Sequence, residues 1–341
     1  MLTPGRLIFG LVALNVGLIA AGAVAVPPVA PKTGTGIRIG LVFDVGGKND
    51  KSFNTAAYRG LLRARDELGV TVEFIEPTEG NDRETALRSL AAKHVDLVIG
   101  VGFIFGPDLE QLAVQFPDVN FAGIDYSPNP DSPALANLAG LRFREQEGSF
   151  LVGAIAGLTT RTNTVGFVGG MKIPLIRKFE VGYETGVHHV CPGCRVLSAY
   201  AGTDPKAFAD APLGQELGAA QYAQGADIIF TAAGKTGDGV FAAARQRGLR
   251  AIGVDSDQFE MAPCCIQTSM IKRVDVAVVD IVKDVIAHTF TGGIHELGLA
   301  ENGVGFVSDE RNRSMLPLDV VQKVKQLGDQ IIAGTIKVPS R

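Results

Sequence analysis

Short apolar runs alternate with segments of helical periodicity along the chain after residue 36. In the first half these runs are IRIGLVF, VTVEFIEP, VDLVIGVG and VNFAGID, and the segment between the first two carries Ala57, Leu61, Ala64 and Leu68 at helical spacing. Strands separated by helices of this length are typical of βαβ units. The pattern therefore predicts a parallel sheet covered by helices.

The same alternation starts again near Asn137. The runs NLAGLRF, TVGFVGG, RVLSAYAG, ADIIFTAAG and LRAIGVDSD predict a second parallel sheet. Beyond it, the apolar spacing predicts a long amphipathic helix over residues 269–293, then a short strand after Leu299 and a last helix near residues 318–327. The expected fold class is α/β, with two parallel sheets of similar size in one chain.

Length and charge narrow the class of protein. The chain has 341 residues, of which 46% are hydrophobic, and this length suits two domains. Its formal net charge is -4, so it lacks the basic surface that nucleic-acid binding requires. We expect no nucleic-acid partner.

The first residues form a separate segment. Arg6 is its only charge, the residues after it are almost wholly apolar, and the tripeptide AVA at residues 23–25 has the pattern of a cleavage site. We predict a signal peptide over residues 1–25 and a Pro/Gly/Thr linker over residues 26–36. The apolar run is long for a signal, so an uncleaved membrane anchor is the alternative. No cysteine lies near the junction, and lipid attachment there is not expected.

The four cysteines all lie in the second half, as Cys191, Cys194, Cys264 and Cys265. An even number in an exported protein favours structural disulfides, and the CPGC segment can close a small loop on itself. Free thiols and a metal site are the alternatives, although the metal site lacks a second CxxC or a suitably spaced histidine pair. We expect no metal and no cofactor.

Polar and aromatic residues gather where the predicted strands end. Ligands of open parallel sheets bind outside the carboxyl ends of the strands. The residues at these ends include Asp44, Asn49, Asp50, Phe53, Phe103, Asp125, Met171, Asp204, Phe208, Asp210, Lys235, Thr236, Asp255 and Asp257. Carboxylates accept hydrogen bonds from hydroxyl and ring N–H groups, and phenyl rings stack on flat solutes, so this set predicts a polar, ring-shaped ligand. A lone strand-end aspartate is also a common helix cap, and Phe179 and Phe208 suit a core equally well.

Catalytic motifs do not occur at these positions. The GKT segment at residues 234–236 has Ile229 where a phosphate loop needs glycine, and the chain contains neither GxSxG nor HExxH. The five histidines lie on predicted helices or in segments remote from the strand ends. We therefore expect a binding protein rather than an enzyme.

The chain resembles the basic membrane protein family, which comprises substrate-binding proteins of ABC transporters and includes purine-nucleoside receptors. The resemblance covers residues 37–290 and is carried, in family order, by GLVFDVGGKNDKSFN, FREQEGSFLVGAIAG, VGFVGG, FEVGYETGV, GVFAAARQRG, AIGVDSDQ and TSMIKRVDVAV. It implies a type I periplasmic binding protein, in which two Rossmann-like lobes joined by three chain crossings close on a ligand. From it we place the N-terminal lobe at residues 37–143 and 259–297, and the C-terminal lobe at residues 144–258 and 298–341.

The same resemblance implies roles for individual residues. Asp44 and Asn49 fall in the first binding loop, Phe53 and Phe208 match two stacking rings, Asp125 matches a carboxylate that reads the base, and Asp255 matches one that takes the ribose hydroxyls. Lys235 lies in a stretch where nucleoside binders place a lysine. The full predicted ligand-binding set is Asp44, Asn49, Asp50, Phe53, Asn54, Asp125, Phe179, Phe208, Gly234, Lys235 and Asp255.

Together these features predict a monomeric periplasmic protein that binds a purine nucleoside, such as adenosine, guanosine or inosine, and delivers it to an ABC transporter permease. Another heterocyclic or sugar-like solute is the first alternative. A nucleoside hydrolase with aspartates around Ca²⁺ is the second, although the carboxylates are spread over both lobes. Many relatives are lipoproteins, whereas this chain lacks the lipid-attachment cysteine and is expected to be free in the periplasm.

Overall fold

The first sheet has six strands in the order β11-β5-β4-β3-β1-β2 and is parallel throughout. The computed structural model describes residues 35–77, 82–131 and 133–341, so the predicted signal peptide and most of the linker lie outside the described residues. The strands are β1 (Arg38–Val42), β2 (Thr71–Ile75), β3 (Leu97–Val101), β4 (Asn120–Ile124), β5 (Leu138–Phe143) and β11 (Gly293–Leu297). The helices of this part are α2 (Phe53–Leu68), α3 (Arg83–Ala91), α4 (Gly106–Gln115) and α9 (Val274–Ile286).

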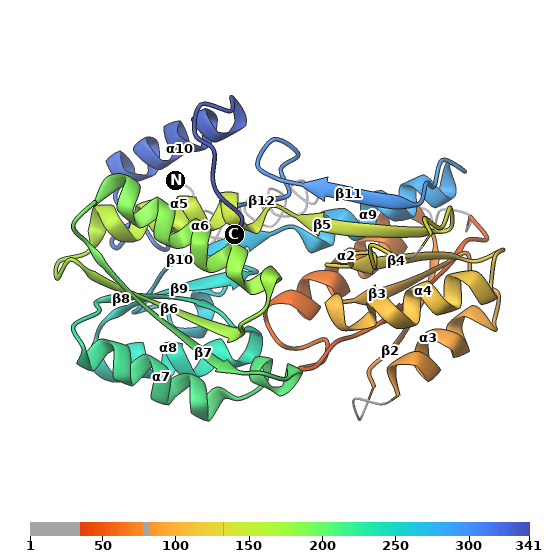
Figure 1. Ribbon diagram of the computed structural model, residues 1–341, viewed down its shortest axis with the longest axis horizontal. Coiled ribbons are helices and arrows are strands. Elements are labelled where there is room, and N and C mark those ends of the chain that lie inside the picture. The colour runs from red at the N-terminus through yellow and green to blue at the C-terminus, as the bar shows by residue number, and fades with distance from the viewer. Residues whose placement is uncertain (1–34, 78–81, 132) are drawn as a thin grey trace, which may run out of the picture. The chain divides into compact units, whose positions relative to one another are not determined.

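The second sheet has the order β12-β10-β9-β8-β6-β7 and is parallel except for the antiparallel edge strand β12. Its strands are β6 (Thr164–Met171), β7 (Arg195–Gly202), β8 (Ile228–Ala232), β9 (Arg250–Asp255), β10 (Ile266–Lys272) and β12 (Val304–Phe306). The helices that go with it are α5 (Glu145–Thr159), α6 (Pro174–Val190), α7 (Ala211–Ala223), α8 (Gly237–Arg247) and α10 (Leu318–Ile332). Figure 1 shows the two sheets with these helices around them.

Each sheet with its helices is called a lobe below. Central strands such as β3 and β8 are buried along their whole length, which is why they appear in the sequence as continuous apolar runs. The edge strand β2 is partly exposed and has mixed composition. The predicted α/β class with two mostly parallel sheets is confirmed.

The helix predicted over residues 269–293 is wrong at both ends. Residues 266–272 form β10, which pairs with β9, and residues 293–297 form β11, which pairs with β5. Strand β10 carries buried polar residues whose side chains bond to neighbouring loops: Gln267 donates to the carbonyl of Met315, and Thr268 donates to that of Val307. These partners are distant in sequence, so the apolar pattern does not reveal a buried strand here.

The chain passes between the lobes at three places. It leaves the first sheet after β5 and enters α5, which packs against β10 and β12; it returns after β10 into α9, which packs against α2; and it leaves again between β11 and β12. The predicted lobe bounds, with a change of lobe between residues 258 and 259, imply a second crossing at that point. It lies at Arg273 instead, because residues 266–272 belong to the second sheet.

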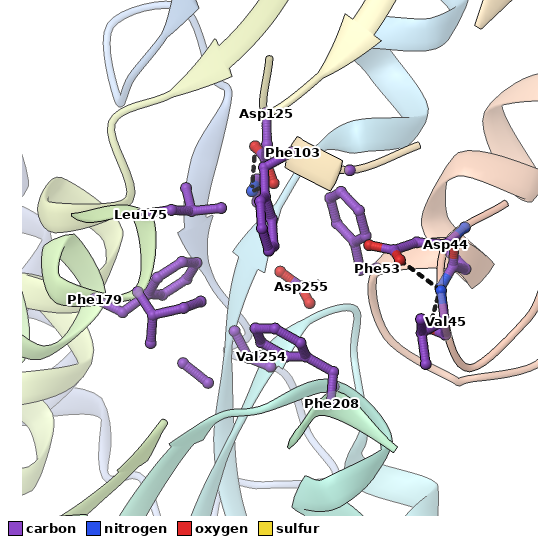
Figure 2. Close-up of a pocket in the computed structure, with 16 residues that line it drawn as sticks. Asp44, Val45, Phe53, Phe103, Asp125, Leu175, Phe179, Phe208, Val254 and Asp255 are labelled. Atoms are coloured by element: carbon purple, nitrogen blue, oxygen red, sulfur yellow. Dashed lines mark hydrogen bonds and ion pairs between the residues drawn. The ribbon is translucent and has the colours of Figure 1, made fainter. Parts of the chain in front are cut away.

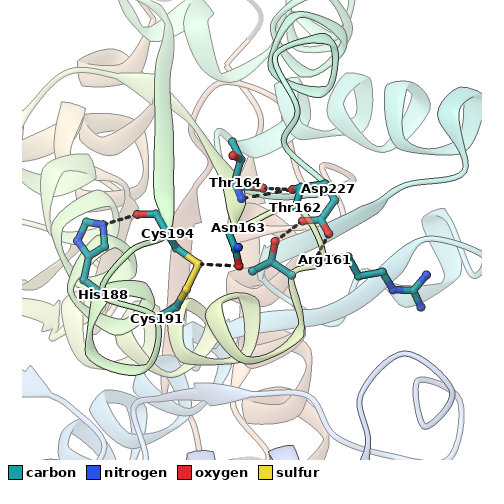
Figure 3. The surroundings of a disulfide bond; sticks show 9 residues. Arg161, Thr162, Asn163, Thr164, His188, Cys191, Cys194 and Asp227 are labelled. Atoms are coloured by element: carbon teal, nitrogen blue, oxygen red, sulfur yellow. Dashed lines mark hydrogen bonds between the residues drawn. A yellow bond between two sulfur atoms is a disulfide. The ribbon is translucent and has the colours of Figure 1, made fainter.

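The cysteines form two bridges, Cys191–Cys194 and Cys264–Cys265, which confirms the disulfide prediction over free thiols and a metal site. The first bridge closes the CPGC loop between α6 and β7, where His188 Nε2 lies 3.1 Å from the carbonyl oxygen of Cys194 (Figure 3). The second immediately precedes β10.

Candidate ligand-binding site

A pocket lies between the lobes at the carboxyl ends of the strands, where the sequence predicts a ligand site (Figure 2). It contains about 580 Å³ of free space, including the part that opens to solvent. The lining residues of the first lobe are Asp44, Val45, Phe53, Asn54, Gly102, Phe103 and Asp125. Those of the second are Leu175, Ile176, Phe179, Phe208, Ala232, Gly234, Val254, Asp255 and Lys272.

Phenyl rings form much of the pocket wall. Figure 2 shows Phe53 on one side, Phe179 on the other, and Phe103 and Phe208 between them. The rings of Phe103 and Phe208 meet edge to face, with centroids 6.4 Å apart. Gly170 makes room for Phe208, since a Cβ at this glycine would come within 2.2 Å of the ring. The pocket therefore offers flat apolar surfaces from both lobes to a ring-shaped solute.

A buried ion pair joins the lobes beside these rings. Lys272, at the end of β10, donates to both carboxylate oxygens of Asp125 at 2.7 Å and lies 3.1 Å from Glu145. Its ammonium group also lies 5.0 Å from the ring centroid of Phe53 and 5.8 Å from that of Phe179. The lysine is only 2% exposed.

Both members of this pair, Lys272 and Asp125, are ionised. Burial alone would lower the pKa of Lys272, but the carboxylates of Asp125, Glu145 and Asp255 outweigh burial and raise it. Burial raises the pKa of Asp125, and Lys272 opposes that shift. We take both groups as ionised, because the ammonium donates to both oxygens of the carboxylate at short distance.

Asp255 has a hydroxyl group rather than a cation as its hydrogen-bond partner. Ser52 Oγ, from the first lobe, donates to Asp255 Oδ2 at 2.7 Å. Burial raises the pKa of Asp255 to about 6, although Lys272 and the serine bond lower it. This carboxyl group therefore titrates close to neutral pH.

Asp44 is the third carboxylate of the pocket. Burial raises its pKa to about 7, against the backbone N–H of Val45, which donates to Asp44 Oδ1. Gly102 has a φ of 115° and lies against this carboxylate, since a Cβ there would come within 2.4 Å of Oδ2. Glycine is therefore required at the end of β3, both for the backbone conformation and for the close approach.

Most of the predicted ligand-binding residues meet in this pocket, namely Asp44, Phe53, Asn54, Asp125, Phe179, Phe208, Gly234 and Asp255. Asn49, Asp50 and Lys235 do not line it. Asn49 and Lys235 are exposed. Asp50 is buried, but its oxygens accept from the backbone N–H groups of Ser52, Asn54 and Thr55, so it caps α2.

Other strand-end aspartates also have structural roles. Asp204 accepts from the backbone N–H of Lys206, and Asp210 accepts from that of Leu213 at the start of α7. Asp257 forms an ion pair with Arg311. The helix-cap alternative therefore holds for Asp204 and Asp210, and Asp257 has an ion-pair partner instead.

Sequence reasoning missed Lys272, the one cation that lines the pocket among the described residues. It was placed within a helix, so it was not considered as a strand-end residue. The signal was present, since Lys272 lies in the motif TSMIKRVDVAV that carries the family resemblance. Phe103 was recognised as a strand-end residue but was not included in the predicted ligand-binding set.

Comparison with known proteins agrees with this architecture. Residues 37–341 match the model of the Bmp family, described as ABC transporter substrate-binding protein PnrA-like. The chain belongs to this family. The resemblance noted in the sequence is thus confirmed, and the Bmp family fold accounts for two α/β lobes with a pocket between them.

Relatives of this Bmp protein are similar over most of their length. It is 36% identical to the CD4+ T-cell-stimulating antigen of Listeria monocytogenes, over 91% of this chain and 90% of that protein. It is 37% identical to a lipoprotein of Pyrococcus horikoshii, over 88% and 79%, and 33% identical to basic membrane protein A of Borreliella burgdorferi, over 89% and 88%.

Solved structures include a similar ABC transporter solute-binding protein from Aeropyrum pernix, with a TM-score of 0.77 and 32% identity over 89% of this chain and 94% of that one. A solute-binding protein from Conexibacter woesei has the same fold, with a TM-score of 0.73 and 22% identity over 89% and 99%. Within the part of the Bmp protein that the structure describes, we find no helix with the length and apolar character needed to cross a bilayer.

Proposed function

We propose that the protein binds a purine nucleoside in the pocket between its lobes and delivers it to the permease of an ABC importer. The observation that carries this proposal is the combination of phenyl rings with three carboxylates and a lysine around one pocket. A nucleoside has a flat base for the rings and a hydroxylated sugar for the carboxylates. Both lobes supply rings and carboxylates, so such a ligand bridges them.

The base stacks between Phe53 and Phe208, and Phe103 forms a third wall. Stacking on one aromatic side chain contributes about 1–3 kcal/mol. Asp125 remains our candidate for reading the base edge. Its oxygens already accept from Lys272, and a carboxylate retains lone pairs for a further donor, so the pair offers an acceptor and a cation together.

The ribose hydroxyl groups donate to Asp255 and Asp44. Both carboxyl groups have pKa values raised by burial, to about 6 and about 7, so hydroxyl donors that favour the ionised form replace the lost solvation. Lys272 takes the role that the sequence assigned to Lys235, because it is the cation that faces the pocket.

We propose no covalent chemistry at this site. The family consists of substrate-binding proteins, and the pocket carboxylates come from both lobes and pair with lysine, serine and backbone groups. A hydrolase would release free base from inosine, and an assay for hypoxanthine with and without Ca²⁺ tests this alternative.

The cellular setting is also a proposal. A signal peptide over residues 1–25, a periplasmic monomer and an ABC permease as partner fit the apolar N-terminus and the family. The mass of the mature chain distinguishes cleavage near residue 25 from an uncleaved anchor, and its sedimentation tests the monomer.

Calorimetric titration tests the nucleoside assignment. Protein stripped of co-purified ligand by unfolding and refolding is titrated with adenosine, guanosine and inosine, with uridine and ribose as comparisons. We expect tight binding of at least one purine nucleoside and far weaker binding of ribose. Absence of purine nucleoside binding by correctly refolded protein would refute the assignment, and native mass spectrometry of unstripped protein would then identify another heterocyclic or sugar-like ligand.

A further inference from the structure

Ser52 occupies the N-cap position of α2, yet its hydroxyl does not cap the helix. A serine at this position ordinarily accepts a hydrogen bond from a backbone N–H of the first turn. Here Asp50 accepts from the N–H groups of Asn54 and Thr55 instead. The Ser52 side chain is fully buried and points to the other lobe, where it donates to Asp255 Oδ2 at 2.7 Å.

Ser52 Oγ also lies 3.3 Å from the carbonyl oxygen of Val254, and two more hydrogen bonds join the same two loops. Ser256 Oγ donates to the carbonyl oxygen of Ser52 at 2.9 Å, and Gln258 Nε2 donates to that of Lys51 at 3.2 Å. We call these two bonds and the Ser52–Asp255 bond the inter-lobe clasp. Only the Ser52 bond ends on a residue that lines the pocket.

We propose that Ser52 is a positioning residue, which orients the Asp255 carboxylate for the ligand when the two lobes close. The donor comes from the first lobe and the acceptor from the second, so the bond exists only in the closed arrangement. The bond engages Oδ2, and the carboxylate can present Oδ1 to the pocket. Closure thereby completes the site for hydroxyl donors instead of merely enclosing the ligand.

The bond also favours the ionised form of Asp255. A hydroxyl donor stabilises a carboxylate, so its loss raises the pKa of that carboxyl group. The other charged groups that act on Asp255 are Lys272 of β10, Asp50 before α2 and Asp125 after β4. All of them remain when Ser52 alone is changed, so a change in the titration of Asp255 reports the loss of the serine hydroxyl.

The test compares Ser52→Ala with Ser256→Ala. Both variants remove one serine hydroxyl from the inter-lobe clasp, but only the first removes the bond to Asp255. Two quantities are measured: the carboxyl titration of Asp255 in ligand-free protein by carbon-13 NMR, and the affinity for inosine across pH by calorimetry. The first measurement does not depend on the proposed nucleoside, on which the second rests.

We expect Ser52→Ala to raise the pKa of Asp255 and to weaken inosine binding about tenfold near neutral pH, since a hydrogen bond to a charged group is lost. Ser256→Ala should leave the Asp255 titration unchanged, and Ser52→Thr should restore both measurements toward those of the wild type. Ser52→Gly serves the same purpose if the alanine variant does not fold, because glycine is tolerated at an N-cap.

Equal effects of Ser52→Ala and Ser256→Ala, with no change in the Asp255 titration, would overturn the proposal and leave Ser52 a purely structural contact. If the titration changes as expected while inosine does not bind the wild type, the positioning role stands and the nucleoside assignment fails.

Discussion

Asp125 and Asp255 occupy the same place in their respective sheets and differ in their partners. Each lies at the end of the third strand of its sheet order: Asp125 directly follows β4 in the first lobe, and Asp255 is the last residue of β9 in the second. Their φ angles are 61° and 63°. Each is held by a residue of the opposite lobe, Asp125 by Lys272 and Asp255 by Ser52. The repeated backbone places a carboxylate at the pocket, where burial raises its pKa and the partner across the gap opposes that shift.

The different partners give Asp125 and Asp255 different electrostatic properties. An ion pair that is almost fully buried keeps Asp125 charged and joins the lobes, whereas burial raises the pKa of Asp255, which accepts from the Ser52 hydroxyl, to about 6. The left-handed backbone is uncommon for residues other than glycine, and aspartate is one of the few that adopt it routinely. Two such residues at equivalent strand ends are consistent with a functional rather than a purely structural role.

We expect the largest loss of stability when the ion pair between Lys272 and Asp125 is broken. Lys272→Met leaves Asp125 and Glu145 buried without their ammonium partner, and removal of one member of a buried pair costs about 3–5 kcal/mol. Chemical denaturation should show this loss, with much weaker ligand binding in calorimetry. The control is Lys283→Met, which removes an exposed bridge to Asp280 and should cost less than about 1 kcal/mol. Similar costs for both variants would contradict a special role for Lys272.

The second prediction concerns pH and Asp255. Its folded-state pKa lies above the usual value because of burial, so the folded state binds protons more readily than the unfolded state. Asp255 should therefore stabilise the ligand-free protein by about 1–3 kcal/mol as pH falls from neutral toward about 4.5, and affinity for a hydroxyl-donating ligand should fall. In pH-dependent denaturation, Asp255→Asn should remove the part of the stability rise that Asp255 contributes. Asp44→Asn should remove the part due to Asp44, whose pKa burial raises further, to about 7. An unchanged profile in Asp255→Asn would contradict the assignment.

The third prediction concerns the contribution of the phenyl rings, rather than the carboxylates, to nucleoside affinity. Phe208→Ala removes one stacking surface and should weaken purine nucleoside binding by about 1–3 kcal/mol in calorimetry. Phe74→Ala, on the partly exposed edge strand β2, is the matched control and should leave affinity unchanged. Equal affinities of the two variants would exclude Phe208 from the binding surface.

The smallest expected effect concerns the lysine that the sequence favoured. Lys235 is exposed and does not line the pocket, so Lys235→Ala should change nucleoside affinity by less than about 0.5 kcal/mol. Titration of this variant beside Lys272→Met compares the two lysines directly. A large loss of nucleoside affinity in Lys235→Ala would show that Lys235 belongs to the binding site.

The sequence predicted the parts of the site that follow continuous apolar strands. Asp44, Asp125 and Asp255 each end such a run, and a parallel sheet brings these ends to one edge. It did not predict β10, because Gln267 and Thr268 are buried through bonds to loops that are distant in sequence. Because that strand was not predicted, Lys272 at its end was not predicted as a site residue either. Such pairings depend on tertiary contacts that a local pattern does not encode.

The central claim is that a purine nucleoside lies between the two lobes, in contact with both. A crystal structure of the protein with bound inosine tests it most directly. We predict the base between Phe53 and Phe208 and a ribose hydroxyl within hydrogen-bonding distance of Asp255. Inosine bound away from these residues, or held by one lobe alone, would contradict the account.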